Sequence, residues 1–215
     1  MALDRRLDRV WTGRLVPEWK LSVAGPPADA PADPGLDTAD EGALVEASLA
    51  GRREAFDVIV QRHQRHIYQL CYRFVGNHED ASDLAQDVFV RAYRGLGGFK
   101  RQSALGTWLY RIGVNVCINR VSASTPRFEP LDAAEITDER NERADATVLR
   151  LERAAEVRAA IAKLPKKQRA TLILRVYQEL PHEEIAGILG SSVGAVKANF
   201  FHALANLKKL MQGQS

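Results

Sequence analysis

Residues 108–119 carry side chains that suit contact with nucleic-acid bases. At about 100° per residue, one helical stripe holds Trp108, Arg111, Asn115 and Asn119. Aromatic rings stack on unpaired bases, arginine binds phosphate, and asparagine reads base edges. By spacing alone, an ordinary amphipathic helix with a solvated polar face is the simpler explanation. The surrounding motifs therefore have to distinguish a base-contacting stripe from an ordinary amphipathic helix.

A short loop before this helix could hold a base that has left its stack. The loop presents Phe99 with two cations beside it, Lys100 and Arg101. It follows three glycines that break the preceding helix: Gly95, Gly97 and Gly98. Nothing in the hydrophobic pattern requires an aromatic side chain for core packing here. Extruded bases are held by stacking, which Phe99 could supply.

Two helices must position this segment. The first ends at Gly76 and carries an apolar stripe of Phe56, Ile59, Val60, His63, Ile67, Leu70, Cys71 and Phe74. Asn77 is the predicted N-cap of the second helix. That helix buries one apolar face and presents Asp80, Asp83 and Asp87 on the other.

The C-terminal part has the spacing of a helix-turn-helix. The predicted helices are residues 147–163, a second that ends at Tyr177 after the turn LPKKQR, residues 182–189, and a longer last helix. Gly190 and Ser191 form the turn, and Ser192 caps the last helix. Its predicted buried stripe is Val193, Val196, Phe200, Ala203, Leu204 and Leu207.

The opposite face of this last helix is predicted to point outward. It holds Gly194, Ala195, Ala198, His202 and Lys209. Small outward residues let a helix backbone lie close in the major groove, where Lys197, Asn199 and His202 make polar contacts. The alternative is a helical hairpin that packs on another protein, but the positive charge of this part favours DNA.

Charge is unevenly distributed along the 215 residues, whose net charge is +3. Residues 43–122 hold 11 basic and 7 acidic side chains, and residues 153–215 hold 10 and 4. The segments 1–42 and 123–152 are net acidic. Two basic blocks separated by an acidic one indicate two nucleic-acid-facing modules joined by a tether that avoids DNA.

Several function classes are excluded by the pattern. His63 and His66 have no further ligand nearby, and Cys71 and Cys117 lie inside helical patterns as buried thiols of a reducing cytoplasm. We find no phosphate-binding loop or nucleophile motif, so we expect no metal, cofactor or catalytic residue. No apolar run approaches a membrane span, and the N-terminus is not a secretory signal.

Two segments are expected to be irregular. Residues 1–40 read as a largely disordered N-terminal extension, either dispensable or a partner-binding tail, although residues 3–16 have amphipathic spacing. Residues 123–150 read as a flexible acidic linker. A linker of about 25 residues reaches about 80 Å when it is fully stretched. That length could separate two DNA contacts by about twenty base pairs. A relaxed coil of that length averages about 25–30 Å, so a scaffold must hold the modules apart.

The order of these motifs carries a family resemblance. The run EDASDLAQDVFVRAYRGL, then Phe99, then TWLYRIGVN and a basic helix-turn-helix resembles the extracytoplasmic-function (ECF) group of sigma-70 factors of bacterial RNA polymerase. The resemblance covers roughly residues 43–122 as sigma region two and residues 151–210 as sigma region four, and we expect the two domains to span residues 41–122 and 151–215. It implies an all-α protein of two small helical domains joined by the acidic linker.

The resemblance assigns roles to residues of region two, which binds the clamp of the polymerase largest subunit and melts the minus-ten promoter element. Phe99 and Asn115 match the pocket for the flipped non-template base. The other expected minus-ten residues are Lys100, Arg101, Trp108, Arg111 and Asn119, with Trp108 equally suited to packing the domain. The expected polymerase-docking residues are Asp80, Asp83, Gln86 and Asp87.

Region four of the family reads the minus-thirty-five element with its second helix and contacts the flap of the second-largest subunit. The matching positions are Ser192, Gly194, Ala195, Lys197, Ala198, Asn199 and His202. Relatives often carry threonine and several arginines there, so the DNA sequence that this chain recognises differs from the common pattern. An anti-sigma factor is a further expected partner.

The sequence therefore predicts a non-catalytic promoter-specificity subunit that acts in the cytoplasm. One alternative is a dimeric helix-turn-helix regulator that binds DNA without polymerase, although it would not need the acidic helix 78–94 beside a base-capturing loop. A second is a nuclease, which would need a metal-binding carboxylate cluster in a substrate pocket.

Overall fold

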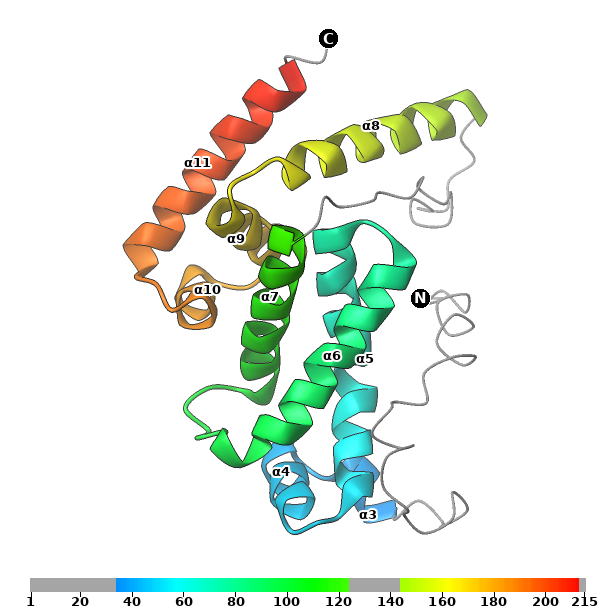
Figure 1. Cartoon of the computed structure of the whole chain (residues 1–215), viewed down its shortest axis with the longest axis vertical. Coiled ribbons are helices and arrows are strands. Elements are labelled where there is room, and N and C mark those ends of the chain that lie inside the picture. The colour runs from blue at the N-terminus through cyan, green and yellow to red at the C-terminus, as the bar shows by residue number, and fades with distance from the viewer. Residues whose placement is uncertain (1–33, 124–143, 213–215) are drawn as a thin grey trace.

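The computed structural model describes residues 34–123 and 144–212, whose regular structure is entirely helical (Figure 1). In chain order the elements are α3 Pro34–Thr38, α4 Glu41–Leu49, α5 Arg53–Val75, α6 His78–Gly95, the 3-10 turn η1 Leu96–Gly98, α7 Leu105–Ala123, α8 Ala144–Ala162, α9 Lys166–Val176, α10 His182–Leu189 and α11 Val193–Gln212. The predicted all-α class is confirmed. The predicted extension lies outside the described residues except for its last part, which includes α3, and so does most of the predicted linker.

The first helical part is a bundle of α5, α6 and α7. Gly76 ends α5 in the left-handed conformation at φ +77°, and the Asn77 side chain caps α6 by accepting the Asp80 N–H at 2.7 Å. The three helices meet closely at Gly113, where an added Cβ would lie 2.8 Å from Cδ2 of Leu70. This close packing fixes which face of α7 turns outward.

The second helical part is formed by α8 to α11 and contains the predicted helix-turn-helix. Gly190 adopts φ +57° after α10, and Ser192 Oγ accepts the Ala195 N–H at 3.2 Å at the start of α11. Local hydrogen bonds at the turn thus follow the sequence prediction. Helices α9 and α10 supply much of the buried core, with Ile173 and Leu174 from α9 and Ile185 from α10.

Three details of this part differ from the sequence prediction. The helix expected from residue 147 begins at Ala144, and the segment KKQR belongs to α9 because the turn is completed by Leu164 and Pro165. Leu204, predicted to be buried, is 45% exposed, since α11 turns its core side toward Val196 and Ala203.

The two helical parts also pack against each other, with α9 and α10 beside α5 and α7 (Figure 1). Arg169 of α9 is 2% exposed and donates to the carbonyl oxygens of Phe74 and Ala162, at the ends of α5 and α8. Helix C-termini carry partial negative charge, which suits a guanidinium. Burial lowers the pKa of Arg169 to about 10, so it stays charged at neutral pH. The sequence did not predict this contact.

Within the described residues, no helix combines the length and the apolar character that crossing a bilayer requires. Both cysteines are buried, Cys71 in α5 and Cys117 in α7, as the sequence predicted. A hydrogen bond with Cys117 and burial raise the pKa of the Cys71 thiol, so it stays protonated.

Candidate nucleic-acid interface

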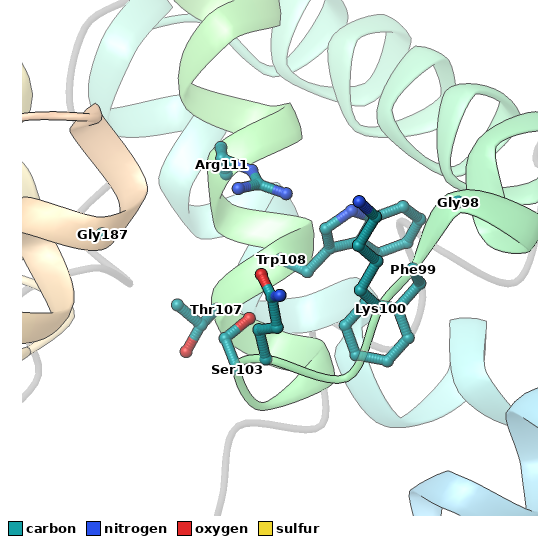
Figure 2. Close-up of a pocket in the computed structure, with 9 residues that line it drawn as sticks. Gly98, Phe99, Lys100, Ser103, Thr107, Trp108, Arg111 and Gly187 are labelled. Carbon is teal, nitrogen blue, oxygen red and sulfur yellow. The ribbon is translucent and has the colours of Figure 1, made fainter.

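A hollow of about 410 Å³ lies between the loop that follows η1 and the first turns of α7 (Figure 2). Its wall includes Phe99 and Lys100 from the loop and Trp108 and Arg111 from α7. The structure thus brings together four of the seven residues that the sequence assigned to minus-ten DNA. A rim of aromatic and cationic groups around an open hollow can receive a planar base and a phosphate.

Phe99 and Trp108 form the aromatic part of this wall. Their ring centroids lie 5.2 Å apart with an interplanar angle of 42°. Trp108 is 8% exposed and reaches Gly95, whereas Phe99 is half-buried. Phe99 therefore has a packing partner that the sequence did not reveal, and Trp108 packs the helix into the domain. The accessible aromatic surface of the hollow belongs mainly to Phe99.

The polar residues of α7 are exposed, as the stripe predicted. Arg111 borders the hollow, whereas Asn115 and Asn119 follow one and two turns further along the same exposed stripe. Neither asparagine lines the hollow. A base held against Phe99 and a base edge read by Asn115 would therefore be separate contacts along one helix face.

Three polar residues of the hollow were missed by sequence reasoning: Gln102, Ser103 and Thr107. They complete the wall from the loop and the start of α7. The available signal was their position between Phe99 and Trp108, because a connection this short cannot carry them far from the hollow.

Arg101 does not line the hollow. Its Nη2 donates to Glu46 Oε1 at 2.9 Å and to the Gly42 carbonyl oxygen at 3.3 Å, both on α4. Its backbone has φ +54°, a left-handed conformation that residues other than glycine seldom adopt. The sequence grouped Arg101 with Lys100, but the structure separates the two cations.

The acidic residues on α6 are in different environments. Asp80 accepts a hydrogen bond from the Asn77 side chain at 2.8 Å and pairs with Arg120 of α7. Asp87 pairs with Arg91 at 2.9 Å, and this carboxylate raises the pKa of the Arg91 guanidinium. Asp83 is exposed and Gln86 is half-buried. Asp83 is therefore the best presented carboxylate on this face.

The outward face of α11 forms a second candidate surface. Ser192, Gly194, Lys197, Ala198 and His202 are exposed, and Ala195 and Asn199 are half-buried. Sequence reasoning missed Phe201, which is 70% exposed on this face with its ring centroid 5.8 Å from that of His202. The signal was the pair of adjacent phenylalanines, because neighbouring helix positions point about 100° apart and Phe200 already belonged to the predicted buried stripe.

The helix-turn-helix borders the hollow as well. Gly187 of α10 contributes to its wall opposite Arg111 (Figure 2). Thr107 Oγ1 donates to Glu184 Oε2 at 3.4 Å, so a carboxylate lies where nucleic acid would approach α7. In this arrangement α10 covers one side of the candidate minus-ten surface.

Both helical parts of the chain match known protein families. The family model "Sigma-70 region 2" matches residues 59–126, and "Sigma-70, region 4" matches residues 154–207. The chain is 37% identical over 181 residues to RNA polymerase sigma-H factor of Pseudomonas aeruginosa, covering 79% of this chain and 92% of that protein. It is 35% identical to ECF RNA polymerase sigma factor SigW of Bacillus subtilis, covering 75% and 91%.

Two solved structures have a similar fold. CnrH in complex with the cytosolic domain of CnrY matches 80% of this chain and 97% of that chain, with a TM-score of 0.57 and 27% identity. RpoE in complex with the anti-sigma factor NepR from Bartonella quintana matches 73% and 96%, with a TM-score of 0.53 and 21% identity. The second similarity concerns the fold alone.

Proposed function

Because this chain belongs to the ECF group of sigma-70 factors, we propose that the hollow beside Phe99 holds the base that leaves the duplex when promoter DNA melts. As a sigma factor the protein is a promoter-specificity subunit, which binds core RNA polymerase, recognises promoter DNA and starts transcription without chemistry of its own. The observation that carries our proposal is the wall of aromatic and cationic groups around this hollow.

In the minus-ten element, the extruded base stacks on Phe99 while Arg111 and Lys100 bind the adjacent backbone. Capture of an unstacked base lowers the free energy of the melted promoter relative to the duplex. Asn115 and Asn119 then contact neighbouring nucleotides along the exposed stripe of α7. Trp108 supports Phe99 from below through the aromatic contact of 5.2 Å.

In the minus-thirty-five element, α11 lies in the major groove with its exposed face toward the bases. Gly194 and Ala198 allow close approach of the helix, and Lys197 binds phosphate. The same major-groove contact is bordered by Ala195, Asn199 and His202. Ser192 caps α11 and so fixes where the helix begins. Phe201 supplies an apolar contact of the kind that recognises a thymine methyl group.

Core polymerase docks on the exposed face of α6, with Asp83 as the central carboxylate beside Gln86 and Asp87. Asp80 orients this face through its pair with Arg120. This face meets the clamp of the largest subunit, and region four meets the flap of the second-largest subunit. The protein therefore acts in the cytoplasm, where the polymerase works.

The contact between α7 and α10 belongs to an inactive arrangement that opens on the polymerase. The carboxylate of Glu184 beside Thr107 would repel the DNA backbone, and Gly187 closes one side of the hollow. Of the proteins with a similar fold, CnrH was solved in complex with the cytosolic domain of CnrY, and RpoE was solved in complex with the anti-sigma factor NepR. An anti-sigma factor is therefore also the expected inhibitory partner of this chain.

Transcription from a duplex promoter, with and without core polymerase, tests this function. We expect weak, unspecific DNA binding by the protein alone at physiological salt, and sequence-specific initiation when core enzyme is added. Tight and specific binding by the isolated protein in a gel-shift assay would favour the dimeric regulator instead.

A further inference from the structure

One face of α4 lies beneath the loop that carries Phe99. This face consists of Gly42, Glu46 and Leu49, which are spaced one helical turn apart. Arg101 contacts the first two through the hydrogen bonds at 3.3 and 2.9 Å. Leu49 lies beside η1, just before the loop, where an added Cβ on Gly97 would be 3.9 Å from its Cδ2.

The helix α4 is itself attached to the far end of the loop. Glu41 Oε1 lies 2.9 Å from Nε2 of His63, a half-buried side chain of α5. The same imidazole borders Gly106, where an added Cβ would lie 3.5 Å from its Cε1. Thus α4 is linked through Arg101 to the middle of the loop and through His63 to the first turn of α7.

The contacts of Arg101 suit a residue that holds the loop on α4 better than a residue that binds DNA. Its guanidinium is engaged by a carboxylate and a carbonyl oxygen, and its backbone is in the left-handed region. A cation that serves a DNA phosphate gains nothing from an adjacent glutamate, because the carboxylate repels that phosphate. Lys100, one residue earlier, lines the hollow and suits a phosphate better.

We propose that Arg101 is a positioning residue, which with Glu46 fixes the loop on α4 so that Phe99 lies over Trp108 and is ready to accept a base. This inference rests on the proposed function of the hollow. Arg101 therefore acts through Phe99 and makes no contact with DNA.

Promoter opening by the holoenzyme tests this inference through the sign of the Glu46 effect. If Arg101 positions the loop, Arg101→Ala and Glu46→Gln each slow opening by about two- to fivefold, the range of an exposed ion pair. The double variant is then no slower than either single one. If Arg101 binds phosphate, Glu46→Gln leaves opening unchanged or speeds it, and that result overturns the proposal.

Lys100→Ala is the matched control. We expect this variant to make the salt dependence of DNA affinity shallower. The magnitude of the slope of log affinity against log salt concentration should fall by about 0.7–0.9, the value of one phosphate contact. Arg101→Ala should leave that slope unchanged. A slope that falls equally in both variants would show that Arg101 is a DNA contact.

Trp108 fluorescence reports the loop position independently of promoter opening. The other two tryptophans are replaced in the variant Trp11→Phe/Trp19→Phe, and quenching by acrylamide is measured in the full chain. Arg101→Ala and Glu46→Gln should raise quenching, whereas Lys100→Ala should not. Unchanged quenching in the first two variants overturns the positioning role. If quenching rises but Phe99→Ala opens promoters normally, the proposed function of the hollow fails while the positioning role stands.

Discussion

The Tyr110 hydroxyl donates a hydrogen bond to Gln178 Oε1 at 2.7 Å, and so joins α7 to the segment that precedes the helix-turn-helix. Burial raises the pKa of Tyr110 to about 12, which keeps the hydroxyl protonated as a donor at physiological pH. Near this bond, Arg73 lies 4.4 Å from the centre of the Tyr177 ring. These contacts therefore help to hold the two helical parts together in this structure.

Removing this hydrogen bond should loosen the contact between the two helical parts. We expect Tyr110→Phe, and separately Gln178→Ala, to reduce the free energy that holds the two helical parts together by about 0.5–1.5 kcal/mol. Energy transfer between dyes on α6 and α11 should then report a larger mean distance in the protein alone. No change in that distance in either variant would show that the bond does not hold the two parts together.

Replacing Phe99 should impair melting more than docking. Phe99→Ala loses a stacking contact worth about 1–3 kcal/mol, and should still bind core polymerase and form closed complexes. Permanganate footprinting of the minus-ten region is the measurement, on duplex and on pre-melted bubble templates. The bubble should rescue only the melting part of the defect. Normal duplex opening by this variant would reduce Phe99 to a packing partner of Trp108.

Asn115 lies on the exposed stripe of α7 outside the hollow, so its replacement should affect base preference. We expect Asn115→Ala to lose about 1–3 kcal/mol of discrimination at one minus-ten position. Competition among promoters that differ at single positions measures this loss. Asn119→Ala, one turn further along the same face, is the matched comparison. An unchanged preference would remove Asn115 from the recognition surface.

Charge reversal at Asp83 should weaken binding to core polymerase. Asp83 is exposed, so Asp83→Lys should change the free energy of unfolding by less than about 0.5 kcal/mol. Asp80→Lys is different, since Asp80 bonds to the Asn77 side chain and pairs with Arg120, and we expect a loss of stability. Affinity for core polymerase and urea unfolding separate the two effects. If Asp83→Lys bound core as tightly as the parent protein, the docking assignment would be wrong.

Phe201 should make promoter affinity depend on a thymine methyl group in the minus-thirty-five element. Replacing that thymine by uracil removes one methyl, worth about 0.8 kcal/mol when buried. The parent holoenzyme should therefore lose about fourfold in affinity at one position, and Phe201→Ala should be insensitive to the same replacement. Leu204→Ala, a second exposed apolar change on α11, is the control. Equal sensitivity of parent and Phe201→Ala at every position would exclude this contact.

The sequence by itself determined the helical class, the turn at Gly190 and the caps at Asn77 and Ser192. Each of these depends on hydrogen bonds between residues at most four positions apart, so the local pattern contains the information. The exposed stripe from Arg111 to Asn119 followed for the same reason, because helical periodicity alone separates the faces of α7.

Only the tertiary structure decided the roles that depend on distant partners. Trp108 and Phe99 share a contact because the loop after η1 folds back over α7, and Arg101 meets Glu46 across 55 positions of the sequence. The proximity of Thr107 to Glu184 across 77 positions likewise depends on how two helical parts pack. Adjacent cations such as Lys100 and Arg101 look equivalent in the sequence. Packing separates them, because one borders the hollow while α4 engages the other.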